Sequence, residues 1–167
     1  MPEEFPQQRS DRLLIRDGAA VRHPRHPWNT ATRALLTDLE AVGFPYSPRV
    51  VGAEDDDDLL SFIPGASGAD GWAPAVDERG LVAAAHLLRA YHDAVSGWQP
   101  VTDPVWFDGS SGTGGDGQIV CHGDFYPCNI VWDGIVPVGL LDFEYAPRRG
   151  AARRCCVCLR ILRAVPR

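Results

Sequence analysis

The sequence predicts an α+β fold made of two lobes, a small β-rich one followed by a more helical one. Residues 1–63 hold short β-type runs around a single helical segment, a pattern typical of a small sheet covered by one helix. Residues 64–149 hold the longest amphipathic segment of the chain and a second hairpin pattern. We therefore expect a β-rich lobe over 1–63, a partial second lobe over 64–149, and a cleft between them.

The first lobe begins with a predicted β-hairpin followed by a helix. Residues 13–22 contain two apolar runs separated by Asp17-Gly18, and an Asp-Gly pair supplies the positive φ angles of a tight turn. Apolar residues then recur at helical spacing over 31–42, and Gly43 is a suitable stop signal. The pattern predicts a strand, a turn, a strand and one helix.

Two more strands are expected to complete this lobe. Residues 49–52 and 59–63 are short apolar runs with strand character. The acidic run 54–58 between them is interpreted as a solvated turn. Residues 64–76 are rich in Gly, Ala and Pro, a composition that favours a linker.

The second lobe is expected to centre on the helix over 77–96, which has one broad apolar face. Gly and Ser dominate the later part of 99–117, which is interpreted as a loop. A buried strand is expected over 119–121, and a hairpin over 130–141 with an Asp-Gly turn.

The chain is acidic and contains no lysine. All 16 basic residues are arginines, and the formal net charge is −6. An acidic body argues against nucleic acid as a partner. No apolar run approaches the roughly 18–20 residues of a membrane span, and the N-terminus lacks the basic and apolar regions of a signal peptide. We therefore expect a soluble, cytoplasmic protein with neither a nucleic-acid nor a membrane partner.

Chemistry is concentrated in two short motifs. The string HGDFYPCN over 122–129 follows a predicted strand, and the string DFE begins at Asp142, directly after the predicted hairpin. Phosphoryl transfer from ATP needs a carboxylate to orient the acceptor hydroxyl and take its proton, together with oxygen ligands that hold Mg²⁺ on the phosphates. Asp124 is the predicted base, and Asn129 and Asp142 are the predicted metal ligands.

The two motifs resemble the signature of the aminoglycoside phosphotransferase family, which belongs to the kinase-like superfamily. The resemblance covers about residues 12–149 and implies a protein-kinase-like two-lobe fold, ATP or GTP as the phosphoryl donor, Mg²⁺, and a small-molecule hydroxyl acceptor of the aminoglycoside type. It also implies that the backbone at Ser61 and Ile63 binds adenine. It implies that His122 packs and hydrogen-bonds within its loop, while Glu144 is either a helper of the metal site or a solvated hairpin end.

The sequence departs from this pattern in the first lobe. Kinase-like folds place a phosphate-binding Lys on the third strand, whereas here Arg22 occupies the matching place. Residues 1–12 contain no Gly for a phosphate-cradling loop, so the first strand and this loop are expected to be missing or altered. These departures leave a second hypothesis open, a non-catalytic remnant or pseudokinase that binds nucleotide weakly or not at all.

The last residues, 150–167, form an atypical tail rich in Arg and Cys. Residues 148–167 carry seven Arg and no acid. They permit an amphipathic basic helix or a three-cysteine zinc site, but we favour a truncation or reading-frame shift, because 153–159 permit the family's Asp-Val-Ala-Tyr-Ala-like text in another frame. Loss of the family's C-terminal helices would leave Leu88 and Leu140 exposed.

Overall fold

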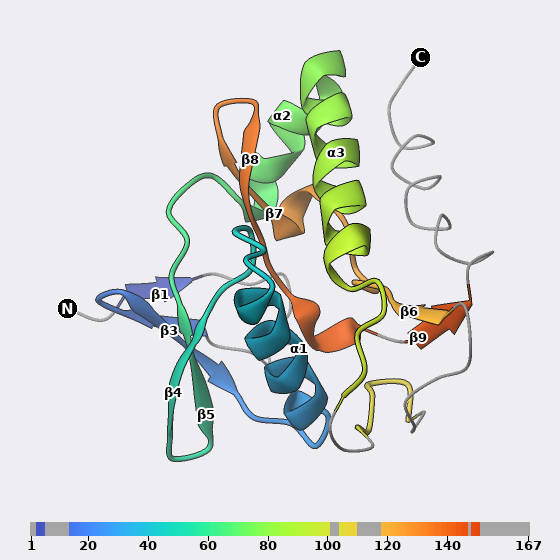
Figure 1. The fold of residues 1–167 in the computed structure, drawn as a ribbon. Helices are drawn as coiled ribbons and strands as arrows, with labels where there is room; N and C mark the ends of the chain where they lie inside the picture. The colour runs from blue at the N-terminus through green and yellow to red at the C-terminus, as the bar shows by residue number, and fades with distance from the viewer. Residues whose placement is uncertain (1–2, 6–13, 101–103, 110–117, 147, 151–167) are drawn as a thin grey trace.

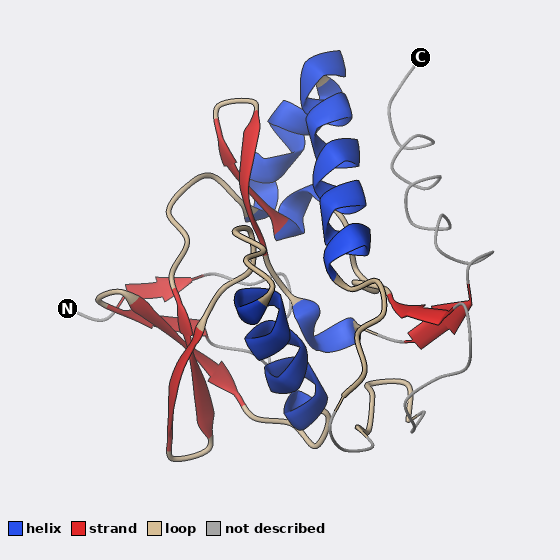
Figure 2. Cartoon of the chain, viewed as in Figure 1, coloured by secondary structure: helices blue, strands red, loops and turns tan. Residues whose placement is uncertain are grey.

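A five-stranded antiparallel sheet forms one side of the molecule (Figures 1 and 2). In this computed structural model the order of its strands is β1-β2-β3-β5-β4. The structure describes residues 3–5, 14–100, 104–109, 118–146 and 148–150. The bounds of the strands are Glu3–Phe5 for β1, Leu14–Asp17 for β2, Ala20–Pro24 for β3, Val50–Glu54 for β4 and Asp57–Ser61 for β5.

The predicted hairpin and helix of this part of the chain are confirmed. Strands β2 and β3 pair around the turn at Gly18, whose φ of 61° suits glycine. Helix α1 spans Asn29–Ala41 and buries its apolar stripe, including Leu35 and Leu39. Of the two alternatives for the first strand, missing or altered, the first was wrong, because a three-residue strand β1 pairs with β2. The segment in which a phosphate-cradling loop would lie is outside the described residues.

The segment predicted as a linker over 64–76 is instead folded. It contains a 3-10 turn η1, Gly68–Gly71, and a short helix α2, Trp72–Val76. Gly71 is buried, and a Cβ there would lie 2.3 Å from the carbonyl oxygen of Pro127. The Gly that looked like a linker residue is therefore required for close packing against the loop that carries the HGD motif.

The second part of the chain is built on helix α3, Glu78–Ala94, which Asp77 caps by accepting a hydrogen bond from the Arg79 amide. The predicted hairpin is confirmed as β7, Ile130–Asp133, paired with β8, Val136–Leu140. Strand β6, Gln118–Val120, pairs with β9, Arg148–Gly150. Two 3-10 turns complete the set: η2, Pro127–Asn129, and η3, Phe143–Tyr145.

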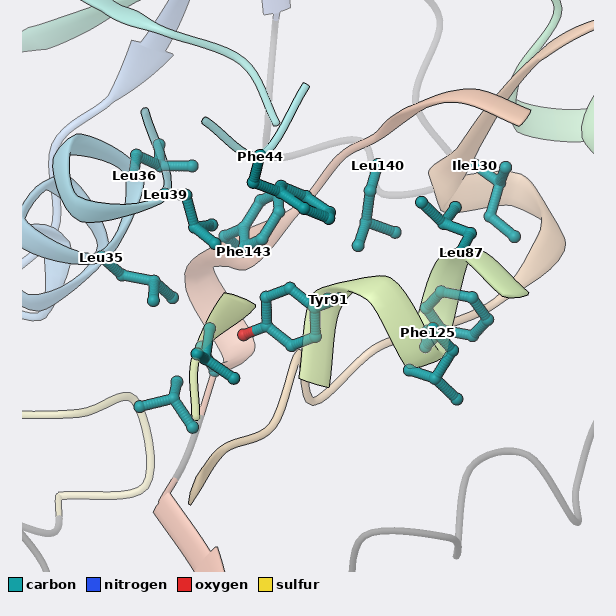
Figure 3. Close-up of a cluster of buried hydrophobic side chains, with 14 of the residues drawn as sticks. Leu35, Leu36, Leu39, Phe44, Leu87, Tyr91, Phe125, Ile130, Leu140 and Phe143 are labelled. Atoms are coloured by element: carbon teal, nitrogen blue, oxygen red, sulfur yellow. The ribbon is translucent and has the colours of Figure 1, made fainter. Parts of the chain in front are cut away.

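The hydrophobic core is one cluster that joins α1, α3 and the two motif segments. Figure 3 shows Tyr91 at its centre, with Phe44 and Phe143 nearby; the ring centroids lie 6.0 and 5.9 Å from that of Tyr91. Leu88 and Leu140 are both buried, so the expectation that they would be exposed was wrong. The lobe boundaries at 63/64 and 149/150 stay predictions, and the core is continuous across the first of them.

No helix in the described part of the chain has the length and apolar character needed to cross a membrane.

Candidate active site

The HGD motif lies in the loop between β6 and β7, and one side chain holds this loop together. The Asn129 amide nitrogen donates to the Asp124 backbone oxygen at 2.9 Å and to its carboxylate Oδ2 at 2.8 Å. The Asn129 backbone amide donates to the Tyr126 oxygen, which closes the turn. Because Asn129 uses its nitrogen toward Asp124, its carbonyl Oδ1 is left for another partner.

Asp142 is held in an unusual backbone conformation beside this loop. It has φ 66° and ψ 50°, the left-handed region that favours glycine, and directly precedes η3. The neighbouring Leu141 amide donates to the Asn129 backbone oxygen at 2.8 Å, which ties the end of β8 to the HGD loop. A non-glycine residue in this conformation is a strained position of the kind that recurs at functional sites.

Cys128, within the HGD loop, lies close enough to Asp124 and Asp142 to feel both charges. Burial raises the pKa of the Cys128 thiol, and the negative charges of both carboxylates raise it further. Asn129 thus contacts Asp124 directly, and the residue before Asp142 is tied to the same loop; a shared site of all three side chains stays a prediction. The Asp142 carboxylate and the Asn129 amide oxygen are hard ligands of the kind that Mg²⁺ takes when phosphates complete its shell. Among the described residues, no group of three or more His, Cys, Asp or Glu is arranged to hold a metal.

His122 is a core residue of the loop. Its ring lies 4.7 Å from the Phe143 ring and 6.1 Å from that of Tyr91. Burial lowers the pKa of His122 to about 4, and the nearby backbone of Leu141 and Asp124 offsets this only in part. Neither ring nitrogen reaches hydrogen-bonding geometry. The predicted packing is therefore present, the predicted hydrogen bonding of the ring was wrong, and the ring is neutral at pH 7.

A hollow opens beside Asp142, between α1, β3, β5 and η3. It is small and opens to solvent, with about 30 Å³ of space that water can reach, room for about one water molecule. Its lining includes charged or polar side chains from each of these elements, among them His23, Asn29, Arg33, Asp58, Asp142 and Glu144. The hollow thus brings charged and polar side chains from four elements next to Asp142, a predicted metal ligand.

Arg22, the predicted nucleotide-binding residue, does not line this hollow. Its guanidinium pairs with Glu54 of β4 and lies 3.9 Å from the Asp57 carboxylate. Side chains alternate between the two faces of a strand, and the next residue, His23, is the one that lines the hollow from β3. The assignment of Arg22 to the nucleotide stays a prediction.

The predicted hinge lies where the sheet passes into the second part of the chain. The Ser61 amide donates to the Arg49 oxygen, and its hydroxyl accepts from the Arg49 amide at 2.8 Å. Ile63 packs on β8, since a Cβ at Gly139 would lie 2.8 Å from its Cγ2. Adenine binding by the backbone of Ser61 and Ile63 stays a prediction.

The acidic run contains a site residue that sequence reasoning missed. Asp58 was assigned to a solvated turn, but it lies in β5 and is only 2% exposed. Its carboxylate accepts hydrogen bonds from Arg33 at 2.9 Å and from Arg25 and Asn29 at 3.2 Å. The interpretation of the whole run as solvated was therefore wrong. The run of four aspartates gave no signal that the last of them faces inward.

Comparisons with known proteins support the fold and leave the activity open. No protein-family profile matches the chain. The chain is 36% identical over 139 residues to a trifolitoxin immunity protein of Rhizobium leguminosarum bv. trifolii, an alignment that covers 80% of this chain and 51% of that protein. The chain therefore spans about half the length of the curated relative that it matches.

A solved structure resembles the fold. The apoenzyme of a macrolide 2'-phosphotransferase from Brachybacterium faecium superposes with a TM-score of 0.51 and 16% identity, covering 99% of this chain and 75% of that one. At this identity the likeness concerns the fold alone. The mixed α/β arrangement, with a small antiparallel sheet and few helices, is thus consistent with part of a kinase-like phosphotransferase fold.

Proposed function

We propose that this protein is a phosphotransferase that moves the γ-phosphoryl group of ATP or GTP to a hydroxyl group of a small molecule. The observation that supports the proposal is that Asn129 donates to Asp124 and that the backbone directly before Asp142 is hydrogen-bonded to Asn129. Phosphoryl transfer relies on such positioning and on charge stabilisation more than on covalent chemistry.

The side chains divide the reaction between them. Asp124 accepts the proton of the acceptor hydroxyl as that oxygen bonds to the γ-phosphorus, while the bond from phosphorus to the bridging oxygen of the nucleoside diphosphate breaks. Asn129 orients the Asp124 carboxylate by donating to its Oδ2. Mg²⁺ would be held by Asn129 and Asp142 and would neutralise charge on the phosphates. His122, neutral and buried, supports the loop and transfers no proton.

The names of the similar proteins point to the acceptor class. One is named for immunity to trifolitoxin and the other for phosphorylating macrolides. We propose that the acceptor here is likewise a hydroxyl-bearing antimicrobial compound, and that an aminoglycoside is one candidate among several.

The nucleotide site is tested by thermal unfolding with and without Mg·ATP. The wild-type midpoint should rise in Mg·ATP, since a ligand that binds only the folded state stabilises it. Asp142→Ala should remove the rise, whereas Asp133→Asn, an exposed acid at the turn of the same hairpin, should retain it. Absence of any shift in the wild type would refute nucleotide binding.

Phosphoryl transfer is tested by release of ADP in the presence of hydroxyl-bearing antibiotics. Asp124→Asn should lower the rate of an accepted substrate by about 10²–10⁴-fold, the contribution of a positioned general base. Asp133→Asn again serves as the matched control.

A non-catalytic protein is the second candidate. It is favoured by one observation: the predicted phosphate-binding side chain, Arg22, is already paired with Glu54 and Asp57. This candidate predicts no release of ADP with any acceptor, together with little or no effect of Mg·ATP on the unfolding midpoint.

A further inference from the structure

The hollow beside Asp142 presents a charge problem for any nucleotide. Asp58, Asp142 and Glu144 all line it. The phosphates of ATP would add further negative charge, and like charges held close together in a partly buried site repel strongly. A nucleotide site here therefore needs a cation from the protein in addition to any metal held by Asp142. Among the described residues that line the hollow, Arg33 alone carries a guanidinium.

Arg33 lies on α1, and most of its hydrogen-bond donors are unused in the described part of the chain. Within the described residues its Nη1 donates to Asp58 Oδ1 at 2.9 Å. A guanidinium has five N–H donors, so this contact fixes the group and leaves donors for a second partner. The side chain is 40% exposed, which makes it accessible from the hollow. A planar group with several donors suits a phosphate.

Asp58 holds Arg33 in place, and the cluster around Asp58 keeps a net positive charge. The carboxylate is buried and accepts from Arg25, Asn29 and Arg33. Two guanidinium groups share one carboxylate, so the cluster keeps one positive charge. The members of such a cluster depend on one another for their hydrogen bonds, and these shared contacts fix the position of the Arg33 guanidinium.

Arg33 and the predicted metal ligand Asp142 lie on elements that pack together. Helix α1 packs directly against η3, the turn that Asp142 precedes. Arg33 on α1 and Asp142 at the start of η3 line the same hollow from these two elements. A phosphate chain in the hollow would thus lie between a fixed cation and a metal-binding carboxylate.

We propose that Arg33 is the phosphate-contacting cation of this site and that Asp58 is the positioning residue that orients it. The inference rests on the proposed function and names a residue that the sequence did not indicate. In this arrangement the cation comes from the helix and the acid that orients it from strand β5. It replaces the prediction that Arg22 on β3 contacts the phosphates.

The test compares binding of Mg·ATP and of adenosine by calorimetry in wild type and three variants. Arg33→Gln should weaken Mg·ATP binding by at least about tenfold, the size expected when a charged hydrogen-bond partner is lost. Adenosine, which has no phosphate, should bind as it does to wild type. Arg33→Lys should restore part of the affinity, because the charge returns without the planar geometry. Asp58→Asn should lower the affinity for Mg·ATP more than the affinity for adenosine. A purely structural role of Asp58 would not change the ratio of the two affinities.

Two further variants separate the possible failures. Arg89→Gln, an exposed arginine on α3 paired with Asp93, is the control that should leave both affinities unchanged. Arg22→Gln tests the competing assignment. The inference is overturned, and the proposed function kept, if wild type binds Mg·ATP, Arg33→Gln binds it equally well and Arg22→Gln does not. If wild type binds neither ligand, the proposed function and this inference both fail.

Discussion

Gly71 offers the most direct test of how the folded 64–76 segment supports the HGD loop. Alanine at this position would place its Cβ 2.3 Å from the Pro127 carbonyl oxygen and 3.1 Å from its carbon. Ordinary contacts are longer than about 3.4 Å, so the backbone of η2 would have to move by roughly 1 Å. That oxygen also accepts the indole N–H of Trp132 at 3.4 Å, so the movement would strain a second contact.

The magnitude follows from two opposing effects. Overpacking against backbone costs about 1–3 kcal/mol. The φ of Gly71 is −66°, which alanine adopts freely. Alanine also restricts the unfolded chain, and this offsets about 0.4–1 kcal/mol of the overpacking cost. We expect Gly71→Ala to lower the free energy of unfolding by about 1–2 kcal/mol, equivalent to roughly 2–8 °C in the midpoint for a chain of this size. Mg·ATP binding should weaken as well, since the moved turn ends at Asn129.

Urea unfolding followed by tryptophan fluorescence would measure the change, because Trp106 and Trp132 are buried and become exposed on unfolding. Gly52→Ala is the matched control: its Cβ would lie 3.6 Å from a Leu59 methyl group, an ordinary contact. The control should stay within about 0.5 kcal/mol of wild type. If Gly71→Ala proved as stable as Gly52→Ala, the packing of η1 against the HGD loop would be wrong.

Three further predictions concern the site and its support. Asp142→Gly should be more stable in urea than Asp142→Ala by about 1 kcal/mol, because φ 66° strains alanine but not glycine. Equal stabilities would contradict the strain. Neither variant should respond to Mg·ATP. The pKa of His122 is about 4 in the folded chain and about 6.5 in the unfolded chain, so the unfolded chain binds the proton first as pH falls. The free energy of unfolding of wild type should therefore drop by about 3 kcal/mol between pH 6.5 and 4. His122→Leu should lack this share of the drop when urea unfolding is measured at each pH. Asp58→Ala should lower the free energy of unfolding by about 3 kcal/mol in the same assay. This is the low end for breaking a buried ion pair, because Arg25 and Arg33 can still reach water. A loss below about 0.5 kcal/mol would contradict the buried cluster.

The sequence predicted the elements whose local signals and tertiary environment agree. The Asp17-Gly18 turn, the periodicity of α1 and α3, and the hairpin of β7 and β8 all lie within a few residues of the expected ranges. The return of the chain before Asp142 to the loop of Asp124 and Asn129 was also foreseeable, because a hairpin brings its two ends together. These are cases in which short-range pattern and fold specify the same arrangement.

Long-range packing was where the prediction failed, and the failures have one physical cause. Gly71 was interpreted as a linker residue because only the distant Pro127 carbonyl explains why a side chain is excluded there. Asp58 was interpreted as solvated because its partners, Arg25, Asn29 and Arg33, come from a loop and a helix that precede it in the chain.

The same cause bears on the assignment of the phosphate-binding cation. Sequence reasoning chose Arg22 by its position along β3, but alternation within a strand makes a difference of one residue decisive: Arg22 pairs with Glu54, while His23 lines the hollow. A strand without an inward-facing cation can still serve a phosphate site if a neighbouring element supplies the charge. In the arrangement that we propose, helix α1 supplies it with Arg33, and the buried carboxylate that orients Arg33 lies on β5. The electrostatic requirement of the reaction thus constrains the hollow as a whole, and the residue that meets it must be sought among all the elements lining the hollow.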